Sequence, residues 1–362
     1  MTARICYPSG GKIEGTGGNF YTKGLNMTLI LTCLTKDFIV QASDRRLTRT
    51  VGGKVELDDD DSNKALIYSN HFVFAYTGLA KLHDQYPSAI DWAAQQLSEK
   101  ENIGDAVLHL GNQASDLMNS NHIRNFYSRS PASVKRLAFV GAGFADVEED
   151  GRKNRRSLRI VISNFFRRED GTWPALPYRH FSVYYNWLPK NCDAELFVAG
   201  QQLPKKRHIE FTRFLRQCVR HKVKPETFGR LLMREIRAVA EKNDYVGKNI
   251  MCTFVPRAFA DGVAGSVRYH FGGVLLQSPV VSTEPQRLEP VEVVSDENRF
   301  VLLPPFDDPR FVYIDRDGKA MPYHGAVYAG PGYYIPPITM HGASLAVPPV
   351  VQVPGPPVDT PL

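Results

Sequence analysis

The sequence predicts an α+β fold in which two stacked β-sheets lie between two layers of helices, a four-layer αββα sandwich. Two observations support it. Strand-like runs come in blocks, and pairs of amphipathic helices separate the blocks, so helices and strands do not alternate one by one. A hydrophobic fraction of 43% with 23% charged residues in a chain of 362 residues is sufficient for a sizeable core. Periodicity alone indicates only the α+β class, and the order of the blocks suggests the layers.

The first block contains four strands in two hairpins. The β-branched runs 27–34 and 38–43 are separated by three polar residues, which is typical of a hairpin. The runs 64–68 and 71–77 form a second pair around Ser69-Asn70. We therefore expect four neighbouring strands before the first helix.

Four helices are predicted from apolar residues that recur every three or four positions. The first two have apolar faces at Ile90, Ala93, Ala94 and Leu97, and at Ile103, Ala106, Val107, Leu110, Ala114 and Leu117. The second two have them at Phe211, Phe214, Leu215, Cys218 and Val219, and at Phe228, Leu231, Leu232, Ile236 and Val239. Strands are expected between and after these pairs, at 137–141, 158–164, 180–187, 195–199, 249–255 and 266–276.

Three regions follow from this order. Residues 1–27 are rich in Gly, Ser and Thr and form an N-terminal extension or propeptide, 28–278 form the folded domain, and 279–362 form a C-terminal extension. The last region holds 16 of the 25 prolines and, with 5 basic and 10 acidic residues, a net charge of −5. Proline disfavours regular helices and inner strands. We expect 279–320 to pack partly ordered against the domain and the remainder to be extended or disordered. A linker-like tail is favoured over a proline-rich ligand for another domain, and the sequence identifies no partner for it.

Composition argues against several classes of protein. No run of 18 apolar residues indicates a membrane span, and the start lacks a secretory signal. The five scattered cysteines favour reduced thiols in a cytoplasmic protein over a disulfide framework, and no metal or cofactor is expected. The net charge of +6 is dispersed, so its basic runs, such as Arg152-Lys153-Asn154-Arg155-Arg156, are read as solvated surface and no nucleic-acid partner is expected.

Four spaced residues suggest chemistry. Thr28 opens the first strand, Asp44 follows the second, Lys64 opens the third and Gly78 ends the fourth. In this order and spacing, the stretch resembles the start of a proteasome β-subunit or its bacterial ring-forming relatives, which are N-terminal-nucleophile hydrolases. The resemblance covers the domain to about Arg257 and has no counterpart to the C-terminal extension.

The resemblance implies a role for each of these residues. Thr28 would be the nucleophile and, through its own α-amino group, the general base. Lys64 would lower the pKa of the nucleophile by its positive field, and Asp44 would keep Lys64 charged and oriented. The backbone N–H of Gly78 would face the developing oxyanion.

Further positions carry a role or depart from the family pattern. Thr48 would contact the substrate backbone, and Tyr76 would line the side-chain pocket. Gln201 stands where the family has a serine close to the nucleophile's amine. The later acid-serine-glycine element keeps only Asp244 and a following glycine. Gln201 and Asp244 are therefore expected in a second layer around the site.

A free amine at Thr28 requires removal of what precedes it. Met27 followed by a small residue is typical of an initiator methionine, so we expect the mature chain to begin at Thr28. Alternatively, residues 1–27 are a propeptide removed in another way, or the site is silent.

Three functions follow as hypotheses. The first is a proteasome-like threonine hydrolase that cleaves peptide or amide bonds in a homo-oligomeric assembly. The second is a catalytically inactive ring or scaffold subunit, and the third is an amidohydrolase acting on a small molecule. We expect the domain to self-associate through its helical layers, with Trp92 and Phe126-Tyr127 on or near the first helix pair.

Overall fold

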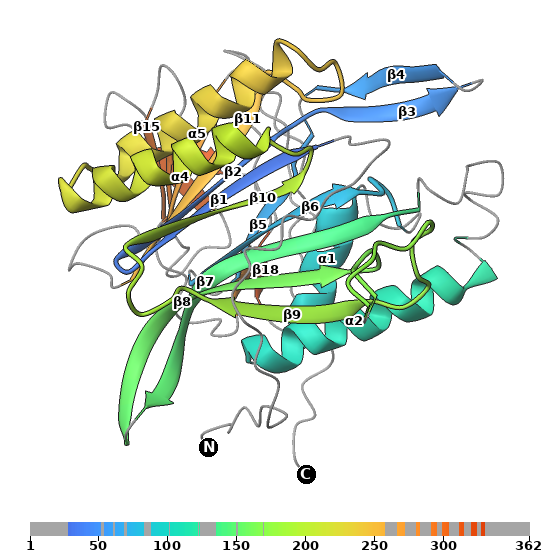
Figure 1. Ribbon diagram of the computed structural model, residues 1–362, viewed down its shortest axis with the longest axis horizontal. Helices are drawn as coiled ribbons and strands as arrows, with labels where there is room; N and C mark the ends of the chain where they lie inside the picture. The colour runs from blue at the N-terminus through green and yellow to red at the C-terminus, as the bar shows by residue number, and fades with distance from the viewer. Residues whose placement is uncertain are drawn as a thin grey trace.

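The computed structural model describes residues 28–257, except 52–53, 61, 69–70, 83–87, 101, 122, 124–134, 150 and 169, and seven short strands between residues 266 and 329. The N-terminal extension 1–27 lies outside the described residues. The fold is the mixed α+β class predicted from the sequence, with two large sheets and one separate hairpin (Figure 1).

Sheet 1 has nine strands in the order β10-β1-β2-β11-β12-β14-β15-β16-β17. Its first five strands are β10 (Ala194–Gly200), β1 (Leu29–Thr35), β2 (Phe38–Asp44), β11 (Ile250–Pro256) and β12 (Ser266–Phe271). All neighbours among these five are antiparallel. The sequence predicts each of these strands to within a few residues.

Sheet 2 has seven strands in the order β18-β13-β5-β6-β7-β8-β9. Its main strands are β5 (Ala65–Tyr68), β6 (Phe72–Gly78), β7 (Leu137–Glu149), β8 (Arg152–Ser163) and β9 (Ser182–Trp187). The strands β7 and β8 are much longer than predicted, and Figure 1 shows their far ends as a hairpin that projects from the body. A further hairpin of β3 (Leu47–Val51) and β4 (Lys54–Asp59) was not predicted.

The four helices that the structure describes are α1 (Ala89–Ser98), α2 (Ile103–Asn119), α4 (Lys205–Arg220) and α5 (Pro225–Ala240). Local sequence sets their starts. The side chains of Ser88 and Asn102 accept hydrogen bonds from the backbone N–H groups of Asp91 and Asp105 and so cap α1 and α2, and α5 begins with a proline.

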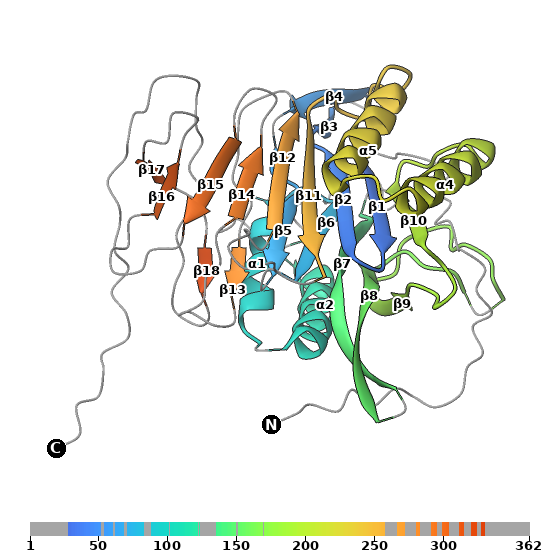
Figure 2. The same ribbon diagram turned by 90° about the vertical axis from the view of Figure 1, so that its left-hand side faces the viewer.

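The apolar pattern divides the core into separate clusters. Leu29, Leu31 and Cys33 of β1 pack with α4 and α5, whereas Ile30 and Leu34 of the same strand pack against sheet 2. Successive side chains of a strand point to opposite faces, so a strand buried throughout faces two cores. In Figures 1 and 2, α4 and α5 cover the outer face of sheet 1, α1 and α2 cover the outer face of sheet 2, and the inner faces of the sheets meet.

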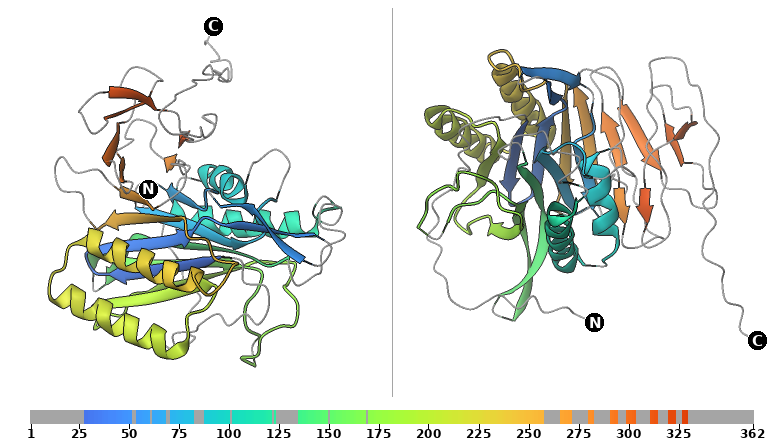
Figure 3. Two further views of the ribbon diagram at one scale, coloured as in Figure 1. Left: turned by 90° about the horizontal axis from the view of Figure 1, so that it is seen from above. Right: turned by 90° about the vertical axis from the view of Figure 1, so that its right-hand side faces the viewer.

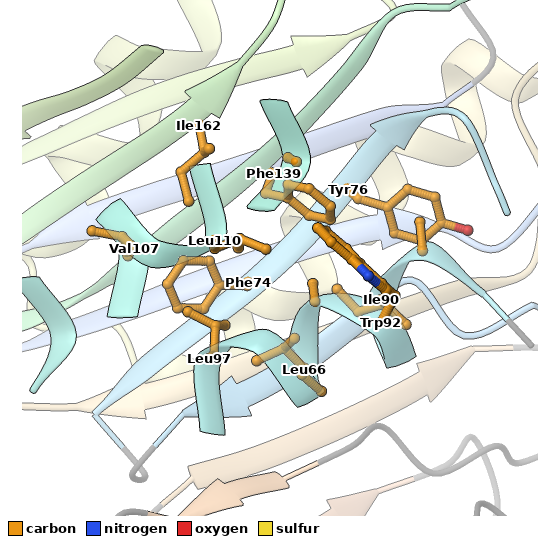
Figure 4. Close-up of a cluster of buried hydrophobic side chains, with 14 of the residues drawn as sticks. Leu66, Phe74, Tyr76, Ile90, Trp92, Leu97, Val107, Leu110, Phe139 and Ile162 are labelled. Carbon is orange, nitrogen blue, oxygen red and sulfur yellow. The ribbon is translucent and has the colours of Figure 1, made fainter. Parts of the chain in front are cut away.

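A cluster of buried apolar side chains joins α1 and α2 to sheet 2 (Figure 4). Trp92 of α1 is only 5% exposed and lies beside Phe139, with ring centroids 6.3 Å apart. Trp92 therefore belongs to the core and cannot serve as a contact between subunits. Phe126 and Tyr127 lie outside the described residues.

The C-terminal extension differs from its prediction. It contributes β14 (Val291–Val294), β15 (Arg299–Leu303), β16 (Phe311–Ile314) and β17 (Ala320–Tyr323) to sheet 1, and β13 (Val280–Ser282) and β18 (Val327–Ala329) to sheet 2 (Figure 3). The expectation that this region supplies no inner strand is wrong. None of β14, β15 and β16 contains proline, and Pro322 lies in β17 at the sheet edge, where a missing N–H is tolerated. The domain boundary at 278 stays a prediction.

Two further predictions concern thiols and membranes. Of the cysteines in the described part of the chain, Cys33, Cys218 and Cys252 are buried thiols and Cys192 is partly exposed. Across the described residues, no helix is both long enough and apolar enough to cross a bilayer.

Candidate active site

Three strand ends bring the predicted residues together. Thr28 precedes β1, Asp44 ends β2, and Lys64 precedes β5 of the opposite sheet. The Nζ of Lys64 donates a hydrogen bond to the Oγ1 of Thr28 at 2.9 Å and lies 3.3 Å from Oδ1 of Asp44. Thr28 is 3% exposed, and Lys64 and Asp44 are completely buried. The arrangement is a buried hydroxyl–ammonium–carboxylate row that joins the two sheets.

Backbone groups fix the Asp44 carboxylate. Its Oδ2 accepts from the N–H of Leu29 at 2.6 Å, and its Oδ1 accepts from the N–H groups of Arg46 at 3.0 Å and Gly247 at 3.2 Å. Three donors in addition to the Lys64 ammonium satisfy a carboxylate that would otherwise be costly to bury. The side chain is thereby held in one orientation toward Lys64.

For both Lys64 and Asp44, burial shifts the pKa in one direction and the pairing of the two charges shifts it in the other. Burial lowers the pKa of Lys64, and the Asp44 carboxylate partly opposes this change. Burial likewise raises the pKa of Asp44, against the Lys64 charge and the three backbone donors. The lowered pKa of Lys64 brings proton exchange at its amine closer to neutral pH. The sequence analysis considered only the effect of Asp44, which raises the pKa of Lys64, and not the effect of burial, which lowers it.

Arg46 is a site residue to which the sequence interpretation assigned no role. Its backbone carbonyl accepts a short hydrogen bond from Lys64 Nζ. Its Nε and Nη2 each donate to the Asp60 carboxylate at 2.8 Å, and its Nη1 donates to the carbonyl of Asp244 at 2.7 Å. The guanidinium therefore ties the turn after β4 and the loop before β11 to the strand end that holds Lys64.

Gly247 lies against this strand end. A Cβ atom at Gly247 would lie 2.7 Å from Cβ of Arg46 and 2.9 Å from Oδ1 of Asp60, closer than real Cβ atoms approach. Only glycine allows the backbone N–H at this position to reach Asp44. The glycine of the shortened acid-serine-glycine element was the sequence signal for this contact.

The carbonyl of Thr28 is held by the end of β10. It accepts from the N–H of Gln201 at 2.7 Å. A Cβ atom at Gly200 would lie 1.9 Å from this carbonyl oxygen and 3.0 Å from Oγ1 of Thr77. Gly200 therefore lies where the start of β1 meets the end of β6, and Thr77 is a neighbour that the sequence interpretation did not name.

The remaining predicted residues take different positions. Gly78 ends β6 with a φ of +107°, and a Cβ there would overlap the carbonyl of Arg136. The hydroxyl of Thr48 is buried and has no hydrogen-bond partner among the described residues. Tyr76 is 1% exposed, and Figure 4 shows its ring at the margin of the α1 cluster with its hydroxyl pointing away from the apolar side chains. The roles of Gly78, Thr48 and Tyr76 stay predictions.

Gln201 and Asp244 contact the site mainly through their backbones. Gln201 uses its N–H on Thr28, whereas its side-chain amide donates to the carbonyl of Gln202 at 3.3 Å. The Asp244 side chain is exposed, and its carbonyl is the group that accepts from Arg46. Within the described ranges, no group of three His, Cys, Asp or Glu side chains is arranged to hold a metal ion.

Comparisons with known proteins give distant structural matches alone. No protein-family model matches the chain, and no curated protein does. Among solved structures it is similar to Anbu (ancestral beta-subunit) from Yersinia bercovieri, with 11% sequence identity and a TM-score of 0.34 over 63% of this chain and 82% of the Anbu chain. A similarity this distant does not assign the chain to a family.

Proposed function

We propose that the chain is a proteasome-like threonine hydrolase that cleaves peptide or amide bonds, with Thr28 as its N-terminal nucleophile. The observation that carries the proposal is the 2.9 Å hydrogen bond from Lys64 to the Thr28 hydroxyl, backed by the buried Asp44. A buried lysine and aspartate are costly to retain for packing alone, because apolar residues of similar volume are often as stable. Their position behind a hydroxyl favours a catalytic purpose.

In the proposed reaction, removal of the residues before Thr28 leaves its α-amino group as the general base. This amine takes the hydroxyl proton as Oγ1 attacks the carbonyl carbon of the scissile amide, and the positive field of Lys64 stabilises the developing negative charge on Oγ1. The amide C–N bond then breaks, the leaving amine takes the proton, and an ester to Thr28 remains. A water molecule, deprotonated by the same amine, hydrolyses this ester and restores the hydroxyl.

The layers suit this chemistry. Helices outside two facing sheets support the proposal of a four-layer N-terminal-nucleophile hydrolase fold, and the ends of three strands hold Thr28, Asp44 and Lys64 together. Gly78, at the end of β6, is proposed to donate its N–H to the oxyanion. Thr48 is proposed to bind the substrate backbone with its hydroxyl, which has no hydrogen-bond partner among the described residues.

A chain that begins at Met27 is expected to hydrolyse peptide amides faster than the 362-residue chain, because only the shorter chain can expose the Thr28 amine after methionine removal. Release of a fluorescent amine from a panel of peptide amides measures the difference. The Thr28→Ala variant of the shorter chain is the matched control and should be inactive. Equal activity of the variant and its parent would contradict the proposal.

The scaffold alternative is favoured by one observation, the burial of Thr28. At 3% exposure its hydroxyl is not accessible to a peptide, so a hydrolase must uncover it. If the shorter chain has Thr28 as its mature terminus and still hydrolyses no amide, the inactive ring or scaffold subunit is the better function.

The proposed assembly concerns the outer surface of α4 and α5. A hollow of about 580 Å³ lies between these helices, lined by Phe211, Phe214 and Leu231 among others, and Phe214 is 44% exposed. We expect a mass of several chains by light scattering at micromolar concentration, and a smaller mass for Phe214→Glu, because a charge in an apolar interface is costly to desolvate. A monomeric parent chain would instead favour the small-molecule amidohydrolase.

A further inference from the structure

The basic run 152–156 at the start of β8 lies beside a hollow that is remote from Thr28. This hollow of about 250 Å³ is formed where the β1–β2 turn, β8, the segment after β9 and the end of β11 meet. Thr28 precedes β1, and the β1–β2 turn follows β1. The seven residues of β1 therefore separate Thr28 from the hollow, a length of about 23 Å at the rise of an extended strand. The hollow is therefore distinct from the candidate active site.

Five cationic side chains from four segments line the hollow: Lys36, Arg155, Arg156, Lys190 and Arg257. No acidic residue is among the described residues that line it. The sequence interpretation took the run containing Arg155 and Arg156 as dispersed surface charge. The fold instead gathers it with cations that are distant in sequence.

Hydrogen bonds hold the walls of the hollow in place. The hydroxyl of Ser157 donates to the carbonyl of Thr35, the N–H of Leu188 donates to the carbonyl of Ser157 at 3.0 Å, and the N–H of Arg257 donates to the carbonyl of Asp37 at 2.8 Å. Nη2 of Arg156 donates to the carbonyl of Leu188 at 2.9 Å. The backbone bonds fix the wall segments, and the last bond positions the Arg156 guanidinium at the rim.

Acids among the described residues lie near two of these cations. Asp146 lies 3.6 Å from Arg155, and Asp193 lies close enough to Lys36 to be affected by its charge while pairing with Arg220 at 2.8 Å. Asp37 is the third acid, in the β1–β2 turn. Like charges around one hollow repel each other, and a bound anion would relieve that repulsion.

We infer that this hollow binds a small oxyanion of the phosphate type, either inorganic phosphate or the phosphate group of a monoester. Guanidinium groups donate paired, charge-assisted hydrogen bonds to phosphate oxygens, and cations on several sides suit a tetrahedral group that carries about two negative charges. The volume accommodates a phosphate group with a small substituent. The inference is independent of the hydrolase proposal, because no residue of the hollow belongs to that site.

Calorimetric titration of inorganic phosphate into the full-length protein at constant ionic strength tests the inference. We expect saturable binding of one phosphate per chain. The double variant Lys36→Gln/Arg257→Gln, which changes two exposed side chains, should bind at least about tenfold more weakly. Lys153→Gln removes an exposed cation from the same strand outside the hollow and should bind within about twofold of the parent. Thermal unfolding of each variant checks that it is folded.

Two further titrations separate the sources of the phosphate. Tighter binding of glycerol 3-phosphate than of inorganic phosphate would support a monoester as the ligand, and the reverse would support the free ion. Citrate binding as tightly as either would overturn the preference for phosphate. The site itself would be overturned by a parent chain without saturable binding, or by equal losses in the double variant and in Lys153→Gln.

Discussion

Replacing Lys64 by methionine is expected to unfold the protein more easily and to abolish the reactivity of Thr28. Methionine has nearly the same length but no charge, so it leaves the Asp44 carboxylate buried without its ammonium partner. Loss of one partner of a buried ion pair costs about 3–5 kcal/mol, and urea unfolding measures this cost. The rate of acylation at Thr28 should fall at least about 100-fold, because the group that donates to Oγ1 is removed.

The double variant Lys64→Met/Asp44→Asn separates stability from chemistry. It removes both charges and keeps an oxygen that can accept from the backbone donors around Asp44. We expect it to recover part of the lost stability and none of the reactivity. A single variant with the stability and acylation rate of the parent would show that the row of three residues is neither structural nor catalytic.

Gly200→Ala is expected to have a comparable effect on stability through the backbone. Gly200 has a φ of +74°, which an alanine adopts only with strain, and the new Cβ would lie 1.9 Å from the carbonyl oxygen of Thr28. The carbonyl must move, and its bond from Gln201 is then lost. We expect a loss of more than about 3 kcal/mol in the free energy of unfolding, together with slower acylation of Thr28.

Gly151→Ala is the matched control for this variant. Gly151, in the turn between β7 and β8, has a similar φ of +71°, but no atom of the described residues beyond its chain neighbours lies within 4 Å of the added Cβ. This variant should lose only about 1 kcal/mol, the cost of the backbone conformation, and should keep the reactivity of Thr28. Equal losses for the two variants would mean that the contact with Thr28 contributes nothing.

Elements with one buried face were predictable, and elements without one were not. The four helices and the strands of the central sheets carry apolar residues at the spacing of their own geometry, so their pattern identifies them. The hairpin of β3 and β4 and the outer halves of β7 and β8 are largely polar, and their pairing depends on backbone hydrogen bonds that leave no apolar period. The strands of the C-terminal extension have three to five residues each and lie between prolines, too short for a reliable pattern.

In the candidate site, the side chains were predictable from the sequence and the backbone groups were not. Thr28, Asp44 and Lys64 were predictable because their side chains carry the chemistry and their spacing resembles a known pattern. The carbonyl of Arg46 and the N–H groups of Gly247 and Gln201 were not, because any residue supplies such backbone groups and only the fold directs them.

Covalent labelling tests the central claim most directly. A protein that begins at Met27 is treated with a β-lactone, which acylates activated hydroxyl groups, and peptide mass spectrometry locates the adduct. The account predicts removal of Met27 and an adduct on Thr28 that is absent from Thr28→Ala. Cys33 is a poor competitor, because burial raises the pKa of its thiol. An adduct that persists in Thr28→Ala, or no adduct on a chain whose mature terminus is Thr28, would contradict the account.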